Sequence, residues 1–276
     1  MELIVFDLDG TLLDASSRIS TYTRETLALL AERDIHYTVA TGRALHGSRD
    51  IIAGHGFRLP QAYKNGVLMW RPDSSDSGRY SHHHFLTNAE IEHIVEAVHS
   101  RGITPFLSTL EPGALHRIYH LPLQTDVERR LAETFGSRMG LEVLPAARMP
   151  ADAEITSISA VGPHEDIEAV ERLVADEPKL VAYAGTALEG PALSWIDIHH
   201  RAGSKGNAVD LLREELGYGR VLVFGDGDND LSMFATADEA YAPSNADAEV
   251  RAAATAVIGH HDEDGIARFL RERFEL

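Results

Sequence analysis

The chain has 276 residues, enough for about two domains, and its 44% hydrophobic and 25% charged residues are a globular composition that excludes wholesale disorder. The net charge of −18 argues against a nucleic-acid partner or an anionic membrane surface, and the absence of cysteine excludes disulfide scaffolds, thiolate zinc sites and cysteine nucleophiles. Because no apolar run reaches the ~18–20 residues of a membrane-spanning helix and no signal peptide precedes the first strand, we expect a soluble, cytoplasmic protein.

The two ends of the chain alternate short apolar runs with helical patterns. Strands are predicted at residues 3–6, 35–40, 221–224, 239–242 and 256–258. Helices are predicted around residues 27–31, 45–53, 208–216 and 265–274, and Asn65-Gly66 between two apolar runs predicts a hairpin. Because strands and helices alternate, we expect a Rossmann-like α/β fold with a parallel sheet between two helical layers.

The pattern changes between about residues 80 and 195. Strands at 103–108 and 115–120 follow one another without a helix between them, and helices are predicted at 89–100, 126–139 and 165–175. This order is typical of an antiparallel sheet with helices on one face. We therefore expect a core of residues 1–79 and 196–276 and an inserted α+β domain of residues 80–195, with a linker at 72–78.

Polar side chains follow the predicted core strands at the points where they end. These residues are Asp7, Asp9, Thr41, Asp226, Asp228 and Asp230. Ligands bind outside the carboxyl ends of the strands in an open parallel sheet, so we expect the carboxylates to converge on one crevice. Carboxylates packed together repel one another unless a cation joins them, and hard oxygen ligands favour Mg²⁺ over zinc.

The spacing of these residues suits phosphate chemistry. Asp7 and Asp9 are two residues apart, so one carboxylate can attack phosphorus while the other handles the proton of the leaving group. Thr41 and the backbone of Gly42 can hold phosphate oxygens. Lys205 lies at the start of a predicted helix, where its charge and free N–H groups favour an anion.

Four motifs in this order resemble those of the haloacid dehalogenase superfamily. They are Asp7-Leu8-Asp9-Gly10-Thr11-Leu12, Thr41-Gly42-Arg43, Lys205-Gly206 and Gly225-Asp226-Gly227-Asp228-Asn229-Asp230. The insert between the second and third motifs resembles the class IIB cap of the Cof-type phosphatases by its position and size.

The resemblance implies a role for each matched residue. Asp7 would be the nucleophile that forms an aspartyl-phosphate, and Asp9 the general acid and base. The Asp7 side chain, the main-chain carbonyl of Asp9 and Asp226 would bind Mg²⁺, and Asp230 would orient the water shell of the metal. The remaining matched residues, Gly10, Thr41, Gly42, Arg43, Lys205 and Asn229, would contact the phosphate or substrate. Arg43 has a second interpretation, as an ion pair between core and cap.

The resemblance implies Mg²⁺-dependent hydrolysis of small phosphorylated metabolites, such as sugar phosphates or phosphorylated cofactors. We expect a monomer or homodimer. Two alternatives stay open: a phosphotransferase or mutase of the phosphomannomutase type, and a non-catalytic module that binds a phosphorylated metabolite. In the insert, Phe106, Tyr183 and Trp195 could stack on a substrate, but we expect them to pack in the core.

Overall fold

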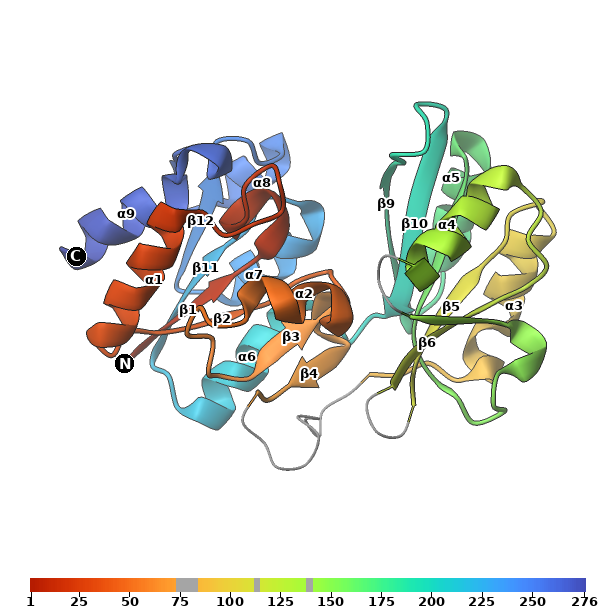
Figure 1. Cartoon of the computed structure of the whole chain (residues 1–276), viewed down its shortest axis with the longest axis horizontal. Helices are drawn as coiled ribbons and strands as arrows, with labels where there is room; N and C mark the ends of the chain where they lie inside the picture. The colour runs from red at the N-terminus through yellow and green to blue at the C-terminus, as the bar shows by residue number, and fades with distance from the viewer. Residues whose placement is uncertain (73–83, 112–114, 138–140) are drawn as a thin grey trace. The chain divides into compact units, whose positions relative to one another are not determined.

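The computed structural model describes residues 1–72, 84–111, 115–137 and 141–276. The chain forms two compact units (Figure 1). One unit comprises Met1–His83 and Gly203–Leu276 and is called the core unit below, and the other comprises His84–Ala202 and is called the cap unit. Among the described residues, no helix has the length and apolar character needed to cross a membrane.

A parallel sheet forms the middle layer of the core unit. Its strands are β1 (Glu2–Phe6), β2 (His36–Val39), β11 (Arg220–Phe224), β12 (Glu239–Pro243) and β13 (Ala256–Ile258), in the order β13-β12-β11-β1-β2. Every neighbouring pair in this sheet is parallel. All five strands and their order of appearance were predicted from the apolar runs.

Helices cover both faces of this sheet. They are α1 (Thr21–Glu32), α2 (Leu45–Ile52), α6 (Lys205–Leu216), α7 (Leu231–Thr236), α8 (Ala248–Ala253) and α9 (Gly265–Phe274). Val5 and Val223 share a buried cluster with Leu212 of α6. On the other face the ring of Phe224 meets Phe269 of α9 with centroids 5.9 Å apart, and α9 lies beside α1 (Figure 1). The predicted three-layer α/β core is confirmed.

A small hairpin extends the core unit beside β2. Strands β3 (Gln61–Tyr63) and β4 (Leu68–Trp70) are antiparallel and are joined by Lys64–Gly66, which confirms the hairpin predicted from Asn-Gly. Asn65 has a φ of 54°, in the left-handed region that Asn and Gly adopt most readily. The backbone N–H of Asn65 donates to the carbonyl of Thr41 over 2.9 Å, which fixes the hairpin next to the end of β2.

The cap unit is built on a second sheet. Its strands are β5 (Phe106–Glu111), β6 (Leu115–His120), β7 (Glu142–Pro145), β8 (Glu154–Pro163), β9 (Leu180–Thr186) and β10 (Leu193–His200), in the order β7-β6-β5-β8-β10-β9. Its helices are α3 (Asn88–His99), α4 (Asp126–Ser137) and α5 (His164–Ala175). The predicted inserted α+β unit is therefore present.

Two details of the cap prediction were wrong. The sheet is not wholly antiparallel, because β7 pairs parallel to β6 after the crossover through α4. The helices do not share one face: Leu107 packs in a cluster with α3 and α5, whereas its neighbour Phe106 packs with Leu131 of α4. Since successive strand residues point to opposite faces, α4 lies on the face opposite α3 and α5.

The structure also moves one domain boundary. The predicted boundary between residues 195 and 196 falls inside β10, which stays paired with β9 as far as His200 opposite Leu180. A strand held by a neighbour on both sides cannot be divided between two units, and the cap unit ends at Ala202. The other boundary, between residues 79 and 80, and most of the predicted linker lie outside the described residues.

A buried carboxylate organises the start of α4. Glu128 is 1% exposed, and its side chain accepts backbone N–H bonds from Thr104 at 2.7 Å, Gln124 at 2.6 Å and Thr125 at 2.8 Å. The Thr125 hydroxyl accepts a bond from the backbone N–H of Glu128 in return, which completes a capping box. Glu128 thus joins the N-terminus of α4 to the chain that leads into β5.

We expect Glu128→Ala to lower the free energy of unfolding of the cap unit by about 2–4 kcal/mol, because it leaves three amides without their partner. Denaturant unfolding followed by hydrogen exchange at Thr104, Gln124 and Thr125 measures the loss. Glu133→Ala, on an exposed position of the same helix, is the matched control. Equal stability and equal exchange in the two variants would contradict this role.

Candidate active site

The ends of three strands bring the predicted residues together in the core unit. The backbone N–H of Asp7 donates to the carbonyl of Phe224 over 2.9 Å, so β1 and β11 end side by side. The carbonyl of Phe6 accepts from Ala40, and Thr41 follows at once. This edge of the sheet is the carboxyl end of β1, β2 and β11, as the strand order requires.

A lysine ammonium is buried between two carboxylates at this edge. Lys205 is the first residue of α6, and its Nζ donates to Oδ1 of Asp7 and to Oδ1 of Asp230, each over 2.6 Å. The Lys205 side chain is wholly buried, and those of Asp7 and Asp230 nearly so. Although burial alone lowers its pKa, the charges of Asp230 and Asp7 hold the pKa of the Lys205 ammonium above its usual value. Lys205 therefore carries its positive charge at neutral pH.

Asp230 is fixed by bonds to both of its carboxylate oxygens. Oδ1 accepts from Lys205, and Oδ2 accepts from the backbone N–H groups of Asp226 at 2.9 Å and Gly227 at 3.0 Å. These bonds hold the loop after β11 in one conformation. The orientation of the metal's water shell, which the resemblance implies for Asp230, stays a prediction.

Asp226 is positioned by the turn after β1. Its Oδ1 accepts from the Thr11 hydroxyl over 2.8 Å, and its Oδ2 lies where a Cβ on Gly10 would be, only 2.1 Å away. Gly10 also has a φ of 68°, so glycine is required here both by backbone conformation and by space. The resemblance implies a phosphate contact for Gly10 and no role for Thr11, although Thr11 belongs to the same motif.

Three carboxylates at this edge can hold a divalent cation. Asp7, Asp226 and Asp230 each offer an oxygen, and these oxygens lie within 4.8 Å of one another. Burial raises the pKa of Asp226 from 3.8 to about 6. Burial, opposed by Lys205 and reinforced by the charges of Asp230 and Asp226, also raises the pKa of Asp7 above its usual value. Such crowding of negative charge is relieved by a bound cation, and the all-oxygen donors suit a hard ion.

The side chain of Asp9 points to a different partner. Nε of Arg43 donates to Oδ2 of Asp9 over 2.5 Å and Nη2 donates to Oδ1, so the guanidinium binds both oxygens of the carboxylate. The Asp9 bond raises the pKa of Arg43, and the Asp9 side chain remains 54% exposed. The pair joins two residues of the core unit, a contact that neither interpretation of Arg43 included.

Three loops at this edge of the sheet contribute further polar groups. Thr41 is buried, and its hydroxyl oxygen accepts from the backbone N–H of Arg43 over 3.1 Å, which leaves its own proton to donate. The amide of Asn229 donates to Oδ1 of Asn65 over 2.9 Å, close to Gly42. These groups offer O–H and N–H donors of the kind that bind phosphate oxygens. Asp228, by contrast, is exposed in its loop.

Comparison with known proteins gives a consistent result. A sequence model of the haloacid dehalogenase-like hydrolases matches residues 4–270. The chain is 26% identical to the 5-amino-6-(5-phospho-D-ribitylamino)uracil phosphatase YitU of Bacillus subtilis, over 99% of this chain and 98% of that one. It is 25% identical to the pyridoxal phosphate phosphatase YbhA of Escherichia coli, over 97% of each chain.

The fold is shared with solved structures as well. The haloacid dehalogenase subclass IIB sugar phosphatase BT4131 superposes with a TM-score of 0.76 at 19% identity, covering 100% of this chain and 99% of that one. Because the sequence model spans nearly the whole chain and the fold agrees from end to end, this chain belongs to the haloacid dehalogenase-like hydrolase family.

Proposed function

We propose that this chain is a phosphatase that hydrolyses small phosphomonoesters through a phosphorylated Asp7, with Mg²⁺ as its cofactor. The observation that carries the proposal is the buried Asp7 carboxylate, held by Lys205 and grouped with Asp226 and Asp230 within 4.8 Å. A purely structural ion pair between Asp7 and Lys205 would not require Asp226, a further carboxylate, beside it.

The first half of the reaction transfers the phosphoryl group to Asp7. A carboxylate oxygen of Asp7 forms a bond to phosphorus while the bond from phosphorus to the leaving-group oxygen breaks. Asp9 donates a proton to that leaving oxygen, for which it has to release one or both of its bonds to Arg43. Lys205, Thr41 and the amide of Asn229 stabilise the oxygens of the transferred group.

The second half releases phosphate. Asp9, now ionised, takes a proton from a water molecule as that water attacks phosphorus, and the bond to Asp7 breaks. Lys205 stabilises the Asp7 carboxylate as it re-forms, since its ammonium lies 2.6 Å from Oδ1. Asp7, Asp226 and the main-chain carbonyl of Asp9 would hold Mg²⁺, with Asp230 orienting its water ligands. The bound cation would supply positive charge that offsets the carboxylates and the phosphate.

Two relatives support a proposal for the substrate class. YitU is a phosphatase for 5-amino-6-(5-phospho-D-ribitylamino)uracil and YbhA for pyridoxal phosphate, and each matches nearly the full length of the chain. Both are small phosphorylated metabolites. We propose the same class for this chain: sugar phosphates and phosphorylated cofactors or their precursors.

Removal of the nucleophile tests the covalent step. Asp7→Asn keeps the size of the side chain and removes the attacking charge, so we expect kcat for p-nitrophenyl phosphate to fall at least about a thousandfold. Asp228→Asn removes one carboxylate from the exposed loop position nearby and should change kcat by less than about twofold. If both variants keep the activity of the parent chain, Asp7 is not the nucleophile.

Removal of the metal tests the cofactor. EDTA should abolish phosphatase activity and excess Mg²⁺ should restore it. Ca²⁺ should not substitute, because it forms longer and more numerous bonds to its ligands than Mg²⁺, which requires octahedral coordination. Initial rates in metal-free buffer with each ion added back are the measurement. Full activity in EDTA would remove Mg²⁺ from the mechanism.

The raised pKa of Asp226 predicts the pH dependence of stability without metal. A carboxyl whose pKa is higher in the folded chain binds more protons there, so stability is lost as pH rises from the unfolded value of 3.8 to the folded value of about 6. The loss for Asp226 amounts to at most about 3 kcal/mol, and Mg²⁺ should diminish it.

Urea unfolding in EDTA at pH 4 and pH 6.5, followed through Trp70 of the core unit, measures this loss. A Trp195→Phe background removes the second indole signal, and titrating groups that do not interact with Asp226 contribute equally to both variants. Asp226→Asn should reduce the loss, because it removes the titration of Asp226 and a charge that raises the pKa of Asp7, and Asp228→Asn should retain the loss. Identical pH profiles for these two variants would show that Asp226 is not destabilised by its ionisation.

A further inference from the structure

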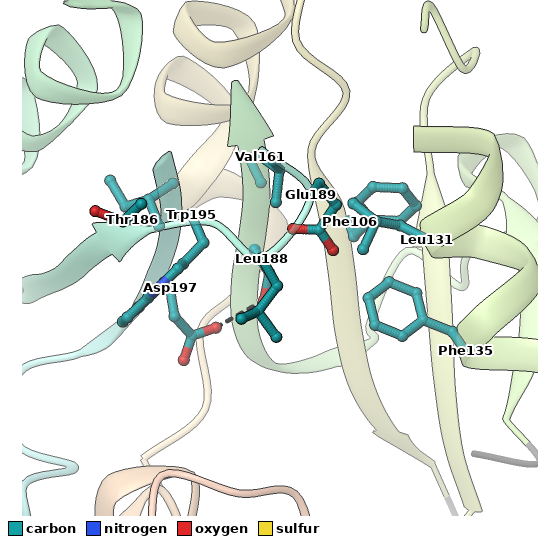
Figure 2. A pocket seen from close by; sticks show the side chains of 12 residues that line it. Phe106, Leu131, Phe135, Val161, Thr186, Leu188, Glu189, Trp195 and Asp197 are labelled. Atoms are coloured by element: carbon teal, nitrogen blue, oxygen red, sulfur yellow. Dashed lines mark hydrogen bonds between the residues drawn. The ribbon is translucent and has the colours of Figure 1, made fainter. Parts of the chain in front are cut away.

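The cap unit contains a hollow of about 400 Å³ beside α4 (Figure 2). Phe106 of β5 and Phe135 of α4 form one side of it, and Trp195 of β10 forms the other. The turn between β9 and β10 adds Leu188 and Glu189. Its size is that of a site for a small organic molecule. None of these residues belongs to the phosphate site of the core unit.

Aromatic residues line this hollow on both sides. The rings of Phe106 and Phe135 meet edge to face, with centroids 5.4 Å apart and an interplanar angle of 76°. Trp195 is 39% exposed, so the expectation that it packs in the core was wrong, whereas Phe106 is 2% exposed and does pack there. An indole that borders an open hollow offers a flat apolar face to a planar ligand.

The indole of Trp195 is also held in position by its partner strand. Trp195 lies opposite Gly185 in the pairing of β10 with β9. A Cβ at Gly185 would lie only 3.0 Å from Nε1 of Trp195, so the absence of a side chain lets the ring lie close to the strand. Contact with the backbone of β9 restricts the rotamers open to the ring, and such restriction lowers the entropic cost of stacking.

The charge of the hollow selects the ligand. Among the twelve described residues that line it, Glu189 and Asp197 are acidic and none is basic. Asp197 accepts a bond from the hydroxyl of Ser159 over 2.7 Å, which orients its carboxylate along the β8–β10 side of the hollow (Figure 2). Two carboxylates beside aromatic rings repel a phosphate and attract a cation or an amino group.

We propose that this hollow binds a planar aromatic or heteroaromatic ring that carries an amino, amidinium or protonated ring-nitrogen group. The ring lies between Trp195 and the phenylalanine pair, and its nitrogen substituent faces Asp197 or Glu189. Such a group could belong to the alcohol part of a phosphomonoester substrate or to a separate small molecule. The binding site itself depends only on residues of the cap unit, not on the proposed phosphatase reaction.

Binding of two matched probes to the full chain tests the proposal. Benzamidine and benzoate share one ring and carry opposite charges. We expect saturable benzamidine binding by titration calorimetry or ligand-observed NMR, and benzoate binding at least about tenfold weaker. Absence of saturable benzamidine binding, or equal binding of the two probes, would overturn the proposal.

Variants of the cap unit locate the binding. Trp195→Ala and Asp197→Asn should each weaken benzamidine binding about fivefold to tenfold, and Trp195→Phe should retain most of the affinity. Glu168→Gln removes a charge from an exposed position of α5, on the other side of the sheet, and should leave the affinity unchanged. Thermal unfolding verifies that each variant is folded. The same affinity in all four variants would show that benzamidine binds elsewhere.

Two phosphates then distinguish the sources of the ring. If the ring belongs to the substrate, Trp195→Ala and Asp197→Asn lower kcat/KM for pyridoxamine 5′-phosphate more than for glycerol 2-phosphate. If it belongs to a separate molecule, both rates change by the same factor while benzamidine binding still falls. Either result agrees with the site. If the parent chain hydrolyses neither phosphate, the proposed function fails, and the benzamidine titration still decides the present proposal.

Discussion

The burial of one ammonium between two carboxylates is the constraint on which the core unit depends. Lys205 contacts Asp7 and Asp230 at equal distances of 2.6 Å, away from solvent. Loss of one partner from such a group leaves an uncompensated buried charge, which is strongly destabilising. The end of β1, the start of α6 and the loop after β11 are therefore fixed relative to one another by the same three side chains.

This arrangement leaves the site with an excess of negative charge. One ammonium faces Asp7 and Asp230, and Asp226 adds a further carboxylate within reach. Burial, reinforced by the charge of the neighbouring carboxylates, raises the pKa values of Asp7 and Asp226. Burying these groups lowers the stability of the fold. The same crowding of carboxylates favours a divalent cation and holds a carboxylate where it can attack phosphorus. Fold stability and reactivity are thus in direct conflict at this edge of the sheet.

Much of the core fold and site could be predicted because both follow from local rules. Apolar runs that alternate with helices require a parallel sheet, and the ends of parallel strands converge, which places Asp7, Thr41 and Asp226 at one edge. The ion pair between Arg43 and Asp9 could not be predicted, because it depends on the directions of two side chains that lie 34 residues apart in the sequence.

In the cap unit, the sequence did not reveal where β10 ends, because its apolar pattern is the same on both sides of the predicted boundary. Nor did it reveal that α4 covers a different face from α3, since periodicity identifies the apolar stripe of a helix and not the face of the sheet it meets.

A crystal structure with Mg²⁺ and beryllofluoride, which mimics a phosphoryl group, tests the central claim most directly. Our account predicts beryllium bonded to a carboxylate oxygen of Asp7, with Lys205 in contact and the metal between Asp7 and Asp226. An adduct on Asp9, or a metal bound away from Asp7, would contradict it.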